Sequence, residues 1–234
     1  MKCKKAAILR FETLPSTNDY AKEKRGEGKN LFIIAKEQSG GRGTKGRRFS
    51  SARGGVYVSA LSFYENLPAK HAFRIMQNAA VSVCETLRSF GVTPQIKWPN
   101  DILVNGKKIC GILIENTFSG EDVHSSIVGI GVNVCNELPL ELQEIATTLA
   151  KETGKEIAVS KVEKRLLKHL KNAALWKRYP QYVGFIGRSV SLICGEETLE
   201  VKMLGVDEEG NLLAETKEGE KKFSSAEVSL RSEK

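Results

Sequence analysis

The chain has 234 residues, of which 41% are hydrophobic, so it is long enough to bury the core of one main domain with a smaller addition. Its 36 basic and 28 acidic residues give a formal net charge of +8, which indicates an anionic partner or serves solubility alone. Five scattered cysteines without a CxxC pair argue against disulfides and zinc, and no leader or run of ~18 apolar residues is present, so we expect a cytoplasmic protein without a membrane partner.

The first half of the chain alternates predicted strands and helices. Residues 5–12 predict a strand, and Ser16 and Thr17 are N-cap candidates for a polar helix that ends near residue 26. Further strands are predicted at residues 31–37 and 54–63. Residues 68–90 begin with a proline and carry apolar side chains at helical spacing, which predicts a long amphipathic helix.

In the second half, residues 95–116 predict a strand, a turn and two strands joined by a hairpin at Asn105-Gly106. Residues 125–134 predict another strand, and a helix is predicted over 159–179 with Ser160 as its cap candidate. After residue 185, short alternating segments separated by turns predict a small barrel of five strands. The predicted fold is α+β: a mixed sheet flanked by helices over residues 1–184, then a barrel over 185–234.

The segment GGRGTKGRR, residues 40–48, predicts an anion-binding loop. Its glycines allow successive backbone N–H groups to face one anion, and its arginines add fork-shaped donors. Gly41 and Gly46 fit the spacing of a P-loop, but Arg47 and Arg48 stand where lysine and a hydroxyl are required, so a Walker ATPase is not expected. A solvated connecting loop is the alternative interpretation of this segment alone.

A second motif, KWPND at residues 97–101, is followed by the hairpin that returns Lys108 toward it. A lysine neutralises a carboxylate and a phosphate as they approach each other, and an aspartate holds magnesium or orients an incoming amine. Together these residues indicate acyl-adenylate chemistry. Taken singly, Asp101 is equally well a turn residue and Lys108 a solvated strand edge.

Seven short motifs in the same order resemble those of the biotin protein ligases: STN at 16–18, the glycine-arginine loop at 41–47, GGVYVS at 54–59, KWPNDI at 97–102, KKICGILIE at 107–115, GIGVNV at 129–134 and ATTL at 146–149. The resemblance implies a biotin/lipoate ligase-like catalytic domain and a C-terminal SH3-like barrel. It also implies a two-step reaction, in which biotin and ATP form biotinyl-5'-adenylate and a lysine of a biotin carboxyl carrier protein then attacks this anhydride. Mg2+ would accompany ATP.

The resemblance assigns roles to matched residues of this chain. Expected at the biotin end are Ser16, Thr17, Asn18, Gln38, Gly41, Arg42, Gly43, Thr44, Lys108, Gly111 and Gly129. Expected at the adenylate are Arg42, Arg47, Phe49, Asn100, Lys108 and Asn133, with Lys108, Asp101 and Arg42 catalytic and Asp101 the candidate metal ligand. Two positions depart from the family, which usually has arginine in place of Thr44 and tryptophan in place of Phe49. Thr44 removes a charge from the loop, whereas Phe49 can still stack on adenine.

The resemblance also bears on partners. Ligases that double as repressors begin with a helix-turn-helix domain, whereas here the first predicted strand starts close to Met1, so DNA binding is not expected. Members of the family are often homodimers, and a homodimer is an alternative to the monomer. Three other functions are alternatives: a lipoate-protein ligase of the same fold, a basic nucleic-acid-binding module, and a degenerate ligase that binds biotin without catalysis. The aromatic content of 7% is low for nucleic-acid binding, and the Lys108–Asp101 pair argues against degeneracy.

Overall fold

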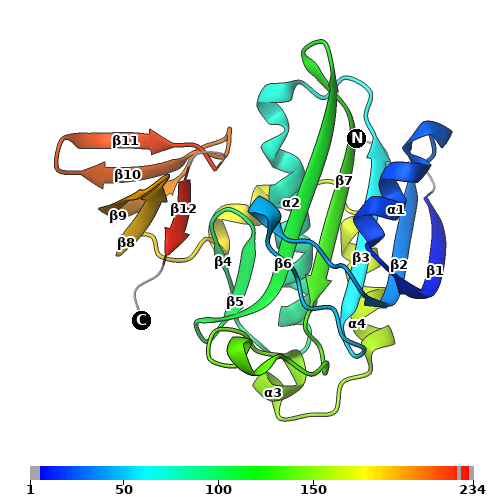
Figure 1. The fold of residues 1–234 in the computed structure, drawn as a ribbon. Coiled ribbons are helices and arrows are strands. Elements are labelled where there is room, and N and C mark those ends of the chain that lie inside the picture. Colours follow the sequence, from blue (N-terminus) through cyan, green and yellow to red (C-terminus); the bar gives the residue numbers. More distant parts are fainter. Residues whose placement is uncertain (1–5, 226–227, 232–234) are drawn as a thin grey trace.

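The structure, a computed structural model, describes residues 6–225 and 228–231 and forms two sheets, with helices packed on the larger one (Figure 1). The larger sheet has the order β1-β2-β3-β7-β6-β5-β4. Only the β1–β2 pair among its described strands is parallel, so the predicted mixed sheet is confirmed. Its strands are β1 (Ala7–Leu14), β2 (Leu31–Gln38), β3 (Val56–Phe63), β4 (Pro94–Lys97), β5 (Asp101–Val104), β6 (Lys107–Ser119) and β7 (Asp122–Val132).

Helices lie on both faces of this sheet, which explains the continuous apolar run in β2. Phe32 and Ile34 point into a core formed with α2 (Phe73–Arg88) and α4 (Val159–Leu170). The alternate residues Leu31 and Ile33 pack with α1 (Thr17–Lys24) on the opposite face. Strands covered on both faces need apolar side chains at every position. The candidate site lies on the face of α1.

Turn chemistry fixed several boundaries as predicted. Ser16 is the N-cap of α1, and its hydroxyl accepts a hydrogen bond from the Asp19 backbone N–H. Asn105 and Gly106 have φ values of 49° and 77°, the left-handed conformation that a tight hairpin between β5 and β6 requires. The helix predicted over 68–90 is present as a short 3-10 turn (Ala69–His71) followed by α2.

The predicted helix over 159–179 is wrong in its second half. α4 ends at Leu170, and a 3-10 segment (Leu175–Gln181) follows. The Asn172 side chain accepts a hydrogen bond from the Ala174 backbone N–H at 3.1 Å, a local turn that competes with helix continuation. Ser160 is not the cap either, because the N-cap residue is Ala158 and it makes no side-chain cap bond.

The short helix α3 (Leu149–Thr153) was not predicted. Thr148 caps it by accepting a hydrogen bond from the Lys151 backbone N–H. Further 3-10 turns lie at Arg25–Glu27, Thr44–Gly46 and Leu140–Leu142. Among the described residues, none of the helices has the length and apolar character needed to cross a membrane.

The C-terminal part forms a separate antiparallel sheet of five strands in the order β11-β10-β9-β8-β12, which agrees with the predicted strand number. It lies beside the end of the larger sheet that carries β4 (Figure 1). Ile96 of β4 forms a parallel bridge to Val183, in the segment that leads to the C-terminal sheet. The strands are β8 (Ser189–Cys194), β9 (Glu197–Val206), β10 (Leu212–Thr216), β11 (Gly219–Phe223) and β12 (Val228–Arg231).

Candidate active site

The floor of the candidate site is made of glycines on two adjacent strands, β6 and β7, with β3 beside them. Gly131 of β7 lies opposite Gly111 of β6 and Tyr57 of β3. One step along, Gly129 lies opposite Leu113 and Ser59. Side chains alternate between the faces of a sheet, so these positions share the face of α1. Because the glycines carry no side chain, they leave space directly above the sheet.

The first turn of α1 fills one end of this space. A Cβ at Gly129 would lie 2.2 Å from Asn18 Oδ1, so only glycine allows α1 to approach this closely. The Ser59 hydroxyl donates to Asn18 Oδ1 at 2.6 Å. The Thr17 backbone N–H and hydroxyl both donate to Gln38 Oε1, at 2.8 and 3.0 Å. A buried array of hydroxyl and amide groups, with their donors and acceptors fixed by one another, therefore stands at this end.

The glycine-arginine loop closes over the site and returns to the sheet. The Gly43 backbone N–H donates to Arg47 O at 2.7 Å, and the Phe49 N–H donates to Gly41 O at 2.9 Å. A Cβ at Gly41 would lie 2.5 Å from Phe49 O and from Ser51 Oγ, so the return of the loop requires glycine there. The loop is thus held by backbone hydrogen bonds at its base.

Two carboxylates hold Arg42 of this loop. Its guanidinium lies 2.7 Å from Asp19 Oδ1 and 3.1 Å from Glu115 Oε2, and Lys22 Nζ lies 2.7 Å from Glu115 Oε1. Partial burial alone would raise the pKa of Glu115, but hydrogen bonds from Lys22 and Asn18 and the charge of Arg42 hold that pKa below its usual value. Glu115 is therefore ionised at neutral pH and ties the loop to α1 and β6.

The aromatic ring of Phe49 lies on the glycine floor. A Cβ at Gly131 would lie 2.4 Å from Phe49 Cε1, and one at Gly111 would lie 3.0 Å from Phe49 Cε2. Lys108 Nζ is 5.9 Å from the ring centroid. Phe49 thus presents a flat apolar surface next to a cation, inside the site.

A β-bulge directs Lys108 into the site. Ile102 pairs with Cys110 and Leu103 with Lys108, so Ile109 is the extra residue. The bulge places Lys108 and Gly111 on the same side, although they are three residues apart. Lys108 Nζ forms an ion pair with Asp101 Oδ1 at 2.7 Å.

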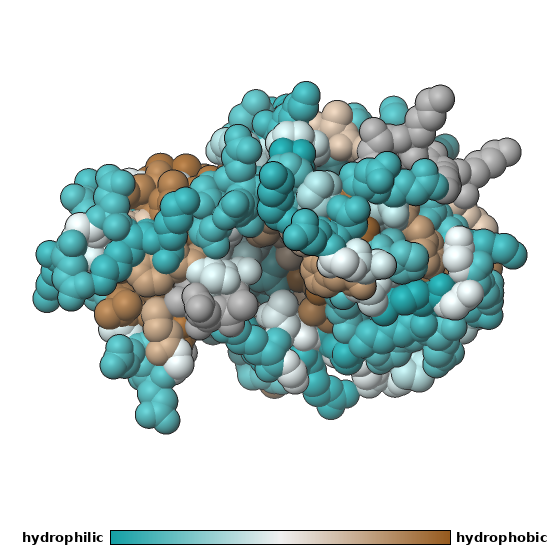
Figure 2. All heavy atoms as spheres, turned by 90° about the horizontal axis from the view of Figure 1, so that it is seen from above, coloured by the Kyte–Doolittle hydropathy of each residue, from teal (hydrophilic) through white to brown (hydrophobic). Residues whose placement is uncertain are grey.

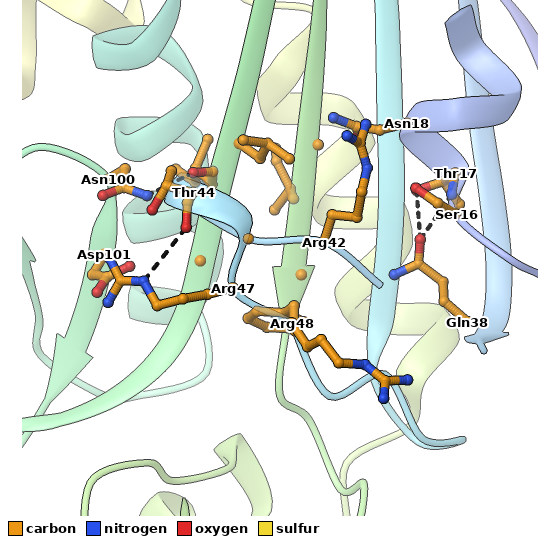
Figure 3. A pocket seen from close by; sticks show the side chains of 18 of the residues that line it. Ser16, Thr17, Asn18, Gln38, Arg42, Thr44, Arg47, Arg48, Asn100 and Asp101 are labelled. Atoms are coloured by element: carbon orange, nitrogen blue, oxygen red, sulfur yellow. Dashed lines mark hydrogen bonds between the residues drawn. The ribbon is translucent and has the colours of Figure 1, made fainter. Parts of the chain in front are cut away.

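Asn100 is fixed next to this pair. The side-chain amide of Asn100 donates to the backbone carbonyl of Ile112 at 2.8 Å, and the backbone carbonyl of Asn100 accepts from the Ile112 N–H at 3.0 Å. Figure 3 shows Asn100, Asp101 and Arg47 on one side of the pocket and the Ser16, Thr17 and Gln38 group on the other, with the loop between them. Polar and charged groups thus converge from both ends on one pocket.

Most of the residues expected at the site line this pocket. They are Ser16, Thr17, Asn18, Gln38, Arg42, Gly43, Thr44, Arg47, Phe49, Asn100, Asp101, Lys108, Gly111 and Gly129. Gly41 does not line the pocket; it stands at the base of the loop, where its carbonyl accepts from the Phe49 N–H. Asn133 is buried beyond the end of β7, where its Oδ1 accepts a hydrogen bond from the Asn136 side chain at 3.3 Å, so the structure does not bring it to the pocket.

The sequence reasoning missed several lining residues: Arg48, Ile112, Leu113, Ile130 and Gly131. Gly131 had a readable signal, because it follows Gly129 by two residues in a predicted strand and therefore shares its face. Arg48 had a weaker one, since it belongs to the basic loop. Its guanidinium donates to Ser39 O at 3.1 Å.

Asp101 is the candidate metal ligand. Within residues 6–225 and 228–231, no group of three or more histidine, cysteine, aspartate or glutamate side chains could hold a metal ion. Magnesium needs no such cage, because proteins commonly bind it through one or two carboxylates together with substrate phosphates. A single carboxylate beside basic side chains fits a metal that is bound with a nucleotide, and it does not fit a site built from protein ligands alone.

Comparison with known proteins shows the family of the chain. The model of the biotin/lipoate A/B protein ligase family matches residues 10–133, and the biotin protein ligase C-terminal domain matches residues 185–231. The bifunctional ligase/repressor BirA of Bacillus subtilis is 35% identical over 243 residues, covering 95% of this chain and 74% of that protein. The chain belongs to the biotin protein ligase family.

Solved structures of biotin protein ligases share its fold. The enzyme of Aquifex aeolicus in complex with biotin and ATP is similar with a TM-score of 0.77 and 31% identity, covering 97% of this chain and 99% of that one. A biotin--[acetyl-CoA-carboxylase] ligase of Paracoccus denitrificans is 36% identical over 108 residues, 45% of either chain. The protein is a ligase, and the pocket described above is its candidate active site.

Proposed function

We propose that the protein activates biotin with ATP as biotinyl-5'-adenylate and transfers the biotinyl group to a lysine of a biotin carboxyl carrier protein. The observation that carries this proposal is the Lys108–Asp101 pair, which stands between a buried neutral polar array and a basic loop. A carboxylate and a phosphate must meet at such a junction, and Lys108 is placed to screen their repulsion. The similarity to a relative solved with biotin and ATP supports the same assignment.

The neutral end of the pocket suits the ureido ring of biotin. Ser16, Thr17 and Asn18 are 3–4% exposed, and their hydroxyl and amide groups line the pocket with Gln38. A ureido group offers N–H donors and one carbonyl acceptor, which such an array can pair completely. A buried site with fixed partners rejects ligands that leave them unpaired.

The basic end suits the adenylate. Arg47 lies there next to Asp101, and Phe49 of the same pocket has a ring placed for stacking on adenine, while Arg42 reaches in from the side of Asn18 (Figure 3). The loop's backbone N–H groups and guanidinium forks would bind the phosphates, and Mg2+ would enter with ATP, with Asp101 as its one protein carboxylate. When bound, the metal would neutralise phosphate charge. Lys108 would bridge the biotin carboxylate and the α-phosphate, and Asp101 would orient the incoming amine.

The carrier lysine would approach along a groove that runs from the pocket toward the C-terminal sheet. The groove is lined at the active-site end by Arg47, Asp101 and Lys108 and at the other end by Phe185 and Arg188. Figure 2 shows a hollow between the two parts of the molecule, seen from above. We propose a catalytic domain at residues 1–184 and a C-terminal domain at 185–234, the latter supporting ATP use or carrier docking.

Pyrophosphate exchange tests the proposal. The protein is incubated with ATP, Mg2+, labelled pyrophosphate and either biotin or lipoate. We expect label to enter ATP only with biotin, because the array around Thr17 and Gln38 pairs a ureido group and leaves a dithiolane without partners. Exchange supported equally by lipoate would favour the lipoate-protein ligase instead.

A second assay separates ligation from DNA binding. The proposal includes no repressor role, although the relative from Bacillus subtilis is named a bifunctional ligase/repressor. We expect no retardation of random duplex DNA at moderate salt, and transfer of biotin to a carrier domain under the same conditions. Retardation without transfer would favour the nucleic-acid-binding alternative.

A further inference from the structure

Trp98 of the KWPND motif is not part of the core of the larger sheet. Its side chain is 1% exposed and packs into the core of the C-terminal sheet, together with Val190, Leu192, Val201, Met203, Leu212 and Ala214. An indole buries more apolar surface than any other side chain, so it is an effective anchor between two parts of a protein. The chain from the catalytic sheet therefore reaches into the C-terminal sheet at this residue.

A hydrogen bond and a close steric fit fix this anchor. Trp98 Nε1 donates to the backbone carbonyl of Gly210 at 3.0 Å, in a buried position. Gly210 has a φ of +92°, and a Cβ there would lie 2.2 Å from the nearest ring atom of Phe73, the first residue of α2. The turn between β9 and β10 thus contacts the catalytic part through both its carbonyl and its Cα.

The active-site residues follow Trp98 almost directly. Only Pro99 stands between Trp98 and Asn100, and the ring of proline restricts the backbone at that position. Asn100 pairs with Ile112 of β6, and Asp101 pairs with Lys108. A displacement of Trp98 must therefore pass to Asn100 and Asp101, because the segment between them has little freedom to absorb it.

We propose that the C-terminal sheet is a positioning element of the active site, with Trp98 and Gly210 as positioning residues for Asn100 and Asp101. The effect is confined to the reacting end of the pocket. The array around Thr17 and Gln38 belongs to α1 and β2, and none of its hydrogen bonds involves the KWPND segment. Loss of the anchor should accordingly impair adenylate formation and leave biotin affinity in place. The inference rests on the proposed function.

Three full-length variants test it. Trp98→Phe keeps an aromatic ring and removes the indole donor, and Gly210→Ala adds a methyl group that has no room beside Phe73. Val162→Ala is the control, because Val162 is fully buried in α4 and belongs to the other core. Pyrophosphate exchange, biotin binding by calorimetry, and amide hydrogen exchange of residues 97–104 are measured below the Tm of every variant.

We expect kcat for pyrophosphate exchange to fall about tenfold or more in Trp98→Phe and Gly210→Ala, while Kd for biotin stays within about twofold, since small misplacements at a reacting centre are costly and distant sites are independent. Amide exchange over residues 97–104 should rise in both variants and stay unchanged in Val162→Ala. Unchanged amide exchange, an equal loss of kcat in the control, or a parallel loss of biotin affinity would overturn the inference. A parent protein without biotin-dependent exchange would refute the proposed function instead, and amide exchange would still decide the positioning claim.

Discussion

At the scale of single residues, chemistry in the pocket depends on a few charged groups held in defined positions. Lys108 and Asp101 neutralise each other, and Arg42 is held by Asp19 and Glu115. These two cations therefore have carboxylate partners before any substrate is present. Such pairs keep the side chains in place, so that binding a phosphate requires an exchange of partners and little reorganisation of the backbone.

Lys108→Ala should cripple adenylate formation, because it removes the lysine that is placed to screen the approach of carboxylate and phosphate. Loss of one such contact costs about 2–4 kcal/mol of transition-state stabilisation, roughly a 30- to 10³-fold fall in the rate of pyrophosphate exchange. Lys107→Ala is the matched control, since Lys107 Nζ donates to Gln143 O at 3.2 Å, away from Asp101. Near-normal exchange in Lys108→Ala would remove this lysine from the mechanism.

Thr44 is the loop residue at which the resemblance leads us to expect an arginine. It lines the pocket without a guanidinium, and Arg48 does not replace one, since its guanidinium donates to Ser39 O. A missing charge-assisted hydrogen bond is worth about 1.5–3 kcal/mol, so biotinyl-adenylate should escape more readily and label bystander proteins. Thr44→Arg should reduce biotin transfer to serum albumin at matched rates of adenylate formation, whereas Thr44→Ser should not. Equal and negligible labelling of albumin by the parent and by Thr44→Arg would contradict the predicted escape of biotinyl-adenylate.

The cysteines should differ sharply in reactivity. Burial raises the pKa of Cys110 and of Cys84, whereas Cys135 is exposed. Since the thiolate is the reacting form and each pKa unit changes its fraction tenfold, iodoacetamide at pH 8 should modify Cys135 at least about tenfold faster than the two buried thiols. Peptide mass spectrometry reports each site, and urea should abolish the difference. Early labelling of Cys110 in the folded protein would show that the β6 region opens.

At the scale of elements, the sequence predicted what local chemistry determines. The cap at Ser16 and the hairpin at Asn105-Gly106 formed as expected, because a hydroxyl acceptor and two left-handed residues suffice to specify them. The end of α4 at Leu170 was not predicted, because the hydrogen bond that the Asn172 side chain accepts from the Ala174 N–H outweighs a helical pattern of apolar residues. The β-bulge that directs Lys108 into the site was not predicted either, because the register of a strand depends on its partner strand.

The glycine floor gives a test at this scale. Gly131→Ala should displace the ring of Phe49, because the new Cβ would lie 2.4 Å from Cε1. A shift of the reacting groups by an ångström costs up to about 10²-fold, so we expect adenylate formation to fall at least tenfold while the Tm changes little. Gly205→Ala in β9 is the control, since no atom lies within 4 Å of its Cβ position. Equal rates in the two variants would show that Phe49 does not define the pocket.

At the scale of the whole molecule, the two sheets are joined by the buried side chain of Trp98. The sequence indicated both parts from their different spacing of turns, and the motifs located the pocket. It did not indicate that Trp98 is buried in the C-terminal core, because nothing in a local pattern records which distant surface a side chain meets. The placement of Asn133 away from the pocket was unpredictable for the same reason. Contacts between parts of a fold are tertiary information.

The most direct test of the account is release of AMP by the whole reaction, measured together with the mass of the carrier. The protein is supplied with ATP, Mg2+, biotin and a biotin-accepting domain of a carboxylase, or with the same domain carrying arginine in place of its acceptor lysine. The account predicts AMP release that requires biotin and is much faster with the intact carrier than the slow release from escaped adenylate, and a carrier mass increased by one biotinyl group. AMP release that is independent of biotin, or a carrier left unmodified while AMP accumulates at the same rate, would contradict it.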